Sequence, residues 1–258
     1  MAPAYRSSET LQEERFSSSS SSFSRGLSKE EEKRLRKKSS SSSSSRSSSL
    51  LAFLTNRLLW RPSSGPLALN CRRHPHYIKI LKDGLSALYT ARGDYTDVGV
   101  VQADRPVASN CALYYFEVEI LNCSSSPRIC VGLTPKSACL TKQPGIEPNS
   151  IGYRSEDGRK LSALSGNSSS SLVSRGGGGS AAGEVFASSY GCKDVIGCGV
   201  HHLSRNLFFT KNGVFVGIAG KLDTQIEYYP SVGMHATDEK VRFNFTGPFV
   251  FDLPKLLQ

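Results

Sequence analysis

The stretch "RNLFFTKNGVFVGIA", Arg205 to Ala219, places apolar and β-branched residues on both sides of an Asn-Gly pair. Asn212 and Gly213 both tolerate a positive φ, which the two central residues of a type I′ turn require. That turn has the same twist as a pair of antiparallel strands. The stretch therefore predicts a β-hairpin with Asn212-Gly213 at its tip.

A clear alternation marks the segment "ALYYFEVEIL", Ala112 to Leu121. Successive side chains of a strand point to opposite faces, so every second residue shares a face. The face expected to enter the core consists of Tyr114, Phe116, Val118 and Ile120. The opposite face, expected to lie outside the core, carries Tyr115, Glu117, Glu119 and Leu121.

Short apolar runs separated by turn signals continue from His76 almost to the end of the chain. Lys82-Asp83-Gly84 and the Asp-Gly of "SIGYRSEDGRKL" are typical turn sequences. No long amphipathic helical period interrupts these runs, so the sequence predicts an all-β sandwich or barrel. The last run, "PFVFDL", is expected to close an edge or to pack across the rim of the domain.

Serine- and glycine-rich segments account for the modest hydrophobic content of 38%. Such segments bury too little surface to offset the entropy lost on ordering. We therefore predict a disordered, Ser-rich basic tail with a short apolar segment over residues 1–62. A domain follows over residues 63–258, with a disordered insertion at about 163–189. The tail holds 12 Lys/Arg and 6 Asp/Glu, so it supplies +6 of the formal net charge of +10.

Catalytic and metal-binding patterns do not emerge from the sequence. It contains no nucleophile elbow, phosphate-binding loop or zinc-protease motif. Cys71, His74 and His76 are close in sequence, but no second ligand pair follows at zinc-finger spacing. Turn and surface roles account for the acidic residues Glu156, Asp157 and Asp194. We expect no enzyme activity, no cofactor, no metal site and no small-molecule substrate.

Seven cysteines form no C-x-x-C pair, and the N-terminus starts polar without an apolar signal-peptide core. These features favour free thiols in a reducing compartment, and hence a cytoplasmic and/or nuclear location. The apolar run "LLAFLTNRLLW" is too short to span a bilayer and contains Arg57, so no membrane span is expected.

Seven motifs occur in the order expected of a SPRY (B30.2-like) domain, and the chain resembles most closely the type found in the Ran-binding-protein-M (RanBPM) family. They are "YYFEVEI", "VGL", "IGYRSEDG", "DVIGCGV", "FFTKNGVFVGIA", "YYPSVGM" and "NF…PFVFD", between about His76 and Asp252. The resemblance implies a bent sandwich of two antiparallel sheets without enzymatic activity. Loops at one rim of such a domain bind a peptide segment or a partner surface.

The resemblance also implies which loops carry the site: residues 90–97, 142–153 and 234–239. Tyr153 aligns with an aromatic residue that lines the pocket of related domains. Ile146 stands where the RanBPM-type pattern has a tryptophan, so one rim anchor is lost. The candidate partner-binding residues are Arg92, Tyr95, Ile146, Tyr153, Met234 and His235.

The resulting hypothesis is a non-catalytic protein-interaction module. The resemblance further implies a substrate-recognition or scaffold role in a Gid/CTLH-like ubiquitin ligase, with ligase subunits among its partners. The LisH and CTLH helical segments expected downstream do not appear before Gln258. Two alternatives remain open: a lectin-like carbohydrate-binding sandwich, and an RNA-associated factor that acts through its basic tail. Of these, nucleic-acid binding is disfavoured because the domain shows no basic stripe.

Overall fold

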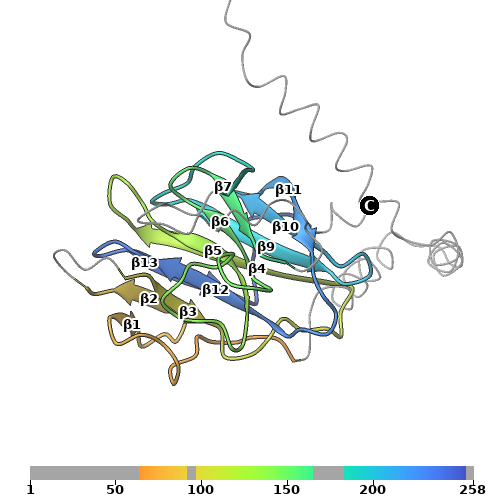
Figure 1. Cartoon of the computed structure of the whole chain (residues 1–258), viewed down its shortest axis with the longest axis horizontal. Helices are drawn as coiled ribbons and strands as arrows, with labels where there is room; N and C mark the ends of the chain where they lie inside the picture. Colours follow the sequence, from red (N-terminus) through yellow and green to blue (C-terminus); the bar gives the residue numbers. More distant parts are fainter. Residues whose placement is uncertain (1–63, 92–96, 165–182, 254–258) are drawn as a thin grey trace, which may run out of the picture. The chain divides into compact units, whose positions relative to one another are not determined.

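The structure, a computed structural model, describes residues 64–91, 97–164 and 183–253. The predicted tail over residues 1–62 and most of the predicted insertion lie outside these described residues. The thirteen regular elements of the described residues are all strands, and they form two antiparallel sheets (Figure 1). The predicted all-β sandwich is therefore confirmed.

The larger sheet has seven strands and the smaller has six. In spatial order, the seven strands are β1 (Ile78–Ile80), β2 (Ser86–Tyr89), β13 (Lys240–Asn244), β4 (Leu113–Asn122), β9 (Val195–His201), β10 (Asn206–Lys211) and β11 (Val214–Lys221). The six are β3 (Gly99–Gln102), β12 (Tyr228–Met234), β5 (Cys130–Pro135), β6 (Ile151–Arg154), β7 (Arg159–Ser162) and β8 (Glu184–Val185).

The Asn-Gly hairpin forms as the sequence predicts. Lys211 at the end of β10 pairs with Val214 at the start of β11, which leaves a two-residue turn between them. Asn212 has a φ of 50° and Gly213 a φ of 77°, both in the left-handed region that a type I′ turn uses.

The core lies between the sheets, and β4 contributes the face that its alternation predicts. Tyr114 is 1% exposed, and Phe116, Val118 and Ile120 are fully buried. Across the sheet, the ring of Phe116 stacks on Phe243 of β13 at a centroid distance of 6.2 Å. Alternate residues of β4 thus supply part of the larger sheet's contribution to the core between the two layers.

The opposite face of β4 differs from the prediction. Tyr115 and Glu117 are only 2% and 3% exposed, because residues 249–251 cross the outer side of the larger sheet. Glu117 Oε1 accepts hydrogen bonds from the backbone N–H groups of Val250 at 2.9 Å and Phe251 at 3.0 Å. The end of the domain therefore covers this outer surface instead of closing an edge or packing across the rim. We call this surface the covered face.

Two strand glycines make room on the covered face. A Cβ atom at Gly197 would overlap the hydroxyl of Tyr115, and one at Gly199 would overlap the ring of Phe208. The "GCG" of β9 therefore lets aromatic rings lie flat against the sheet. Phe251 completes this aromatic layer at 5.6 Å from Tyr115.

Part of the predicted insertion is ordered. Glu184–Val185 forms β8, which pairs with Arg159–Lys160 of β7. Phe186 then packs edge-on against Tyr153, with the ring centroids 5.7 Å apart. The described part of the predicted insertion therefore contains a short strand and an apolar side chain that packs against the core.

Candidate partner-binding rim

One end of the sandwich is built from three chain segments that are distant in sequence. We call this end the rim and define it by residues 90–91, 123–128 and 235–239. The Thr237 hydroxyl donates to the carbonyl of Ala91 at 2.9 Å. The Asn122 side-chain amide donates to the carbonyl of Asp238 at 2.9 Å. Side chain to backbone bonds therefore hold the segments together where the ladder pairing has ended.

A buried carboxylate organises the rim from within. Glu239 is completely buried, and its Oε1 accepts the backbone N–H of Arg128 at 2.6 Å. Its Oε2 accepts the N–H groups of His235 at 2.8 Å and Ala236 at 3.0 Å. Burial raises the pKa of Glu239, while these three donors act in the opposite direction. The carboxylate thereby fixes two rim segments relative to each other.

Glu239 is not among the functional residues that the sequence predicts. It lies immediately before β13, and no spacing in the sequence connects it with Arg128, which lies 111 positions away. The interaction is set by the fold, because β13 and β4 pair and bring the two segments to the same end. No local pattern could have revealed it.

A long connection between β5 and β6 lies over the outer side of the smaller sheet, beside the rim. Leu140 accepts the backbone N–H of Val100 in β3 at 2.8 Å. Pro144 packs closely over Gly233 of β12, where an added Cβ would lie 3.1 Å from the proline ring. The Gln143 side chain donates to the carbonyl of Arg128 at 3.5 Å, which connects this segment to the rim.

Tyr153 and Met234, two of the predicted partner-binding residues, have no exposed surface. Alternation places their side chains between the sheets, because Gly152 and Gly233 occupy the outer side of the same strands. The Tyr153 ring lies 4.9 Å from Tyr190, and its hydroxyl donates to the carbonyl of Ser188. The expected direct contact of Tyr153 and Met234 with a partner does not fit this burial. Both residues belong to the core.

The remaining predicted residues fall into two groups. Ile146 is 38% exposed and His235 is half-buried, so both have surface that a partner can reach. His235 belongs to the rim, and Ile146 belongs to the adjoining β5–β6 connection. Arg92 and Tyr95 lie outside the described residues.

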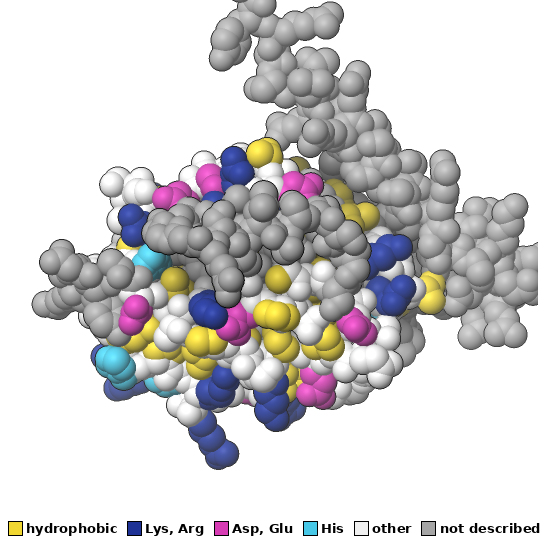
Figure 2. Space-filling view, in the orientation of Figure 1, with side chains coloured by type: hydrophobic (Ala, Val, Ile, Leu, Met, Phe, Trp, Pro, Cys, Tyr) yellow, Lys and Arg dark blue, Asp and Glu magenta, His cyan; other side chains and the backbone are white. Residues whose placement is uncertain are grey.

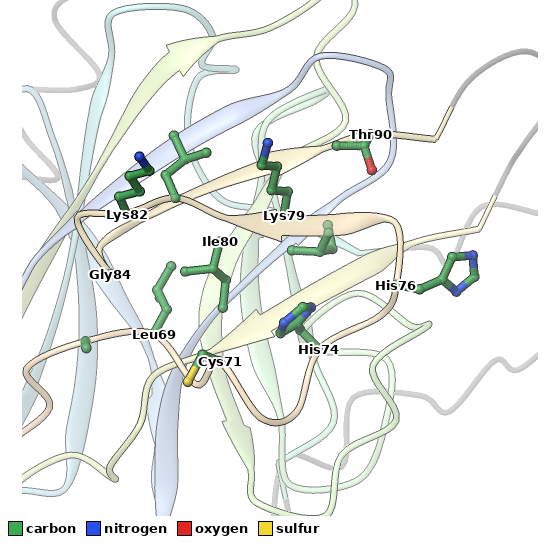
Figure 3. A pocket seen from close by; sticks show the side chains of 12 residues that line it. Leu69, Cys71, His74, His76, Lys79, Ile80, Lys82, Gly84 and Thr90 are labelled. Atoms are coloured by element: carbon green, nitrogen blue, oxygen red, sulfur yellow. The ribbon is translucent and has the colours of Figure 1, made fainter.

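A separate hollow of about 590 Å³ lies beside the edge strand β1. Figure 3 shows it with Lys79 and Lys82 from the region of β1 and with Cys71 and His74 from the preceding loop. His76 points away from Cys71 and His74, so these three side chains do not converge on one point (Figure 3). The hollow is basic but has no convergent polar set.

Charged and apolar side chains are interspersed on the face of the described domain that Figure 2 shows. Basic side chains in dark blue lie among acidic side chains in magenta and apolar ones in yellow. This arrangement differs from the continuous basic surface that a nucleic-acid backbone favours. Within residues 64–91, 97–164 and 183–253, no helix has the length and apolarity needed to cross a membrane.

Comparisons with known proteins match this architecture. The family model "SPRY domain" matches residues 113–248. "Ran-binding protein M homolog" of Arabidopsis thaliana is 35% identical over 69% of this chain and 35% of its own length. "Ran-binding proteins 9/10 homolog" of Drosophila melanogaster is 33% identical over 68% of this chain and 17% of its own length. The chain therefore spans about a third or less of these relatives.

A solved structure supports the same assignment. The "Crystal structure of human SPRY domain" is 32% identical and covers 67% of this chain and 98% of its own, with a TM-score of 0.52. The family model, the relatives and this structure agree, and the chain belongs to the SPRY domain family.

Proposed function

We propose that this domain acts by binding: it holds an extended peptide segment or a partner-protein surface against the rim and performs no chemistry of its own. Membership of the SPRY family and likeness to Ran-binding proteins are consistent with a protein-interaction module. One observation supports the position of the site. The Glu239 carboxylate accepts backbone hydrogen bonds from two loops. Each loop carries an exposed side chain, Arg128 in one and Thr237 in the other.

The chemistry of the rim and of the adjoining β5–β6 connection suits a partner with both apolar and polar groups. Ile146 offers aliphatic surface, His235 an imidazole and Arg128 a guanidinium that can pair with a carboxylate. Loops that are held in place lose little entropy on binding, which favours affinity. An adaptor of this kind needs only micromolar affinity, on the order of −8 kcal/mol. Arg92 and Tyr95, which lie outside the described residues, stay proposed partner-binding residues.

The proposed biological role is that of a substrate-recognition or scaffold component with ubiquitin-ligase subunits among its partners, in the cytoplasm or nucleus. The support is the resemblance to RanBPM-type domains, with 35% identity to the Arabidopsis relative. Because this chain spans a small part of such relatives, the role of the whole relative is carried over as a proposal only.

The rim proposal can be tested with peptides selected from a displayed random library against the full chain. Binding is then measured by calorimetry for the wild type and for Ile146→Ala and His235→Ala. We expect each variant to weaken binding about tenfold, the equivalent of about 1.4 kcal/mol. Val250→Ala is the matched control, because Val250 is also an exposed aliphatic residue, at 57%, but lies on the covered face.

Equal affinity for all variants, or a loss confined to Val250→Ala, would contradict binding at the rim. Calcium-dependent binding on a glycan array would instead support a lectin-like function. Salt-sensitive RNA binding that disappears on deletion of residues 1–49 would support the RNA-associated alternative.

A further inference from the structure

Two cysteine side chains meet at the border of the rim. Cys123 directly follows β4, and Cys192 lies just before β9. Their Sγ atoms are 2.7 Å apart, although both residues are free thiols. Cys192 is exposed, whereas Cys123 is half-buried. The pair is therefore both in contact and open to small reagents.

Backbone hydrogen bonds hold the two cysteines in this position. β4 and β9 are antiparallel neighbours, with Glu119 opposite Val195. The pairing continues beyond the strands, because Lys193 N–H donates to Ile120 O at 2.8 Å and Ile120 N–H donates to Asp194 O at 3.0 Å. These bonds hold the segment before β9 against the end of β4, and the two sulfur atoms meet just beyond the paired residues. The sulfur contact is therefore held in place by the backbone on both sides.

The other five cysteines lack this arrangement. Cys111, Cys130 and Cys198 are buried, and Cys71 is exposed. Cys139 is partly exposed, and its Sγ lies 3.1 Å from the Thr141 hydroxyl, which lowers the pKa of the thiol. Cys139 therefore contrasts with the pair of Cys123 and Cys192: its thiol is made more acidic, and its neighbour in the structure is a hydroxyl group.

We propose that Cys123 and Cys192 are an oxidisable dithiol that closes to a disulfide when the protein meets a hydroperoxide. This proposal goes beyond partner binding and does not depend on it. The exposed Cys192 thiolate attacks the peroxide oxygen, which forms a sulfenic acid and releases water or an alcohol after proton uptake. The Cys123 thiol then attacks the sulfenic sulfur, the S–S bond forms and a second water leaves.

The order of these steps follows from the surroundings of each thiol. Burial, followed by the hydrogen bond with Cys192, raises the pKa of Cys123 to about 12. Cys123 is therefore the poorer first nucleophile. Its contact with Cys192 Sγ at 2.7 Å places it to resolve a sulfenic acid formed on the exposed Cys192. A disulfide in this place would tie residues 123–128 of the rim to the start of β9, and a reductant would release them.

The experiment oxidises the reduced full-length chain with hydrogen peroxide, alkylates the remaining thiols and maps the peptides by mass spectrometry without reduction. We expect a linked peptide containing Cys123 and Cys192 that disappears after treatment with dithiothreitol. The oxidised protein should show slower amide exchange over residues 124–128 and a higher denaturation midpoint.

Matched variants distinguish this pair from general thiol oxidation. Cys123→Ser and Cys192→Ser should each abolish the linked peptide, and Cys139→Ser should leave it unchanged. The wild-type map decides the proposal even if one variant folds poorly. Linkage of Cys192 to Cys71 or Cys139 in similar yield, or oxidation of Cys192 to a sulfinic acid without any linkage, would overturn it.

Discussion

Two buried glutamates, in two regions of the domain, perform the same task with different results. On the covered face, Glu117 accepts the N–H groups of Val250 and Phe251 and the hydroxyl of Tyr115. At the rim, Glu239 accepts three backbone N–H groups from two loops. The first carboxylate brings an aromatic cover onto a sheet, and the second holds loops whose side chains remain exposed. The chain itself covers the surface around Glu117, whereas the rim around Glu239 keeps side chains that a partner can reach.

The largest expected effect concerns packing on the covered face. Gly199→Ala adds a Cβ that would overlap the buried Phe208 ring, so the ring or the strand must move. We expect the free energy of unfolding to fall by about 2–3 kcal/mol, as is typical of overpacked cores. Urea denaturation of the variant and the wild type measures the difference.

Gly191→Ala is the matched control beside the rim. The nearest atoms to an added Cβ there, Cys123 Sγ and the Pro127 ring, lie at an ordinary contact distance of 3.7 Å. We expect the free energy of unfolding to change by less than about 0.5 kcal/mol. Equal losses for the two glycine variants would show that the covered face is not more tightly packed than the rim.

The same substitution at each of the two glutamates tests whether their roles differ. Glu117→Gln and Glu239→Gln each replace one acceptor oxygen with an NH₂ group that faces N–H donors. We expect each variant to lose about 1–3 kcal/mol of stability, because buried donors lose their partner. Only Glu239→Gln should also weaken the binding of a selected peptide.

Hydrogen exchange localises the two effects. Faster exchange is expected at residues 250–251 in Glu117→Gln, and at Arg128, His235 and Ala236 in Glu239→Gln. Weakened peptide binding in Glu117→Gln with intact binding in Glu239→Gln would reverse the functional assignment of the two regions.

A smaller effect is expected in the pH dependence of stability. Folding raises the pKa of Glu239 above 4.5, so its contribution is full below that pH and is lost as the pH rises through the folded pKa. The Arg154 hydrogen bond lowers the pKa of Asp157 below 3.8, so its contribution is lost as the pH falls through the folded pKa. The contributions of Glu239 and Asp157 to stability therefore change in opposite directions as the pH rises.

Urea denaturation at a series of pH values tests these signs. The stability of Glu239→Gln should rise more steeply with pH than that of the wild type above about pH 4.5. Asp157→Asn should lose less stability than the wild type on acidification below about pH 3.8. Identical slopes for the three proteins would contradict the assigned shifts.

Features that depend only on neighbouring residues were predictable from the sequence. The Asn212-Gly213 turn and the core face of β4 depend on neighbouring residues, and both agree with the structure. The covered face was missed, because Glu117 meets Val250 across 133 positions. Glu239 was missed for the same reason.

For Tyr153, the alternation of the strand and the family resemblance give different predictions. Ile151 and Tyr153 share a strand face by alternation, and both are completely buried. The family resemblance suggested a pocket wall, whereas the period of the strand indicated the core. Ile146 and His235 lie in irregular connections, where no period applies, so their exposure became visible only in the fold.

The most direct test of the central claim is a hydrogen-exchange footprint of the full chain with and without a selected peptide. Binding at the rim predicts slower exchange over residues 123–128 and 235–239 and in the connection around Gln143 and Ile146. The covered face at residues 249–251 should exchange at the same rate in both states. Protection confined to the covered face, or to the hollow beside β1, would contradict the account.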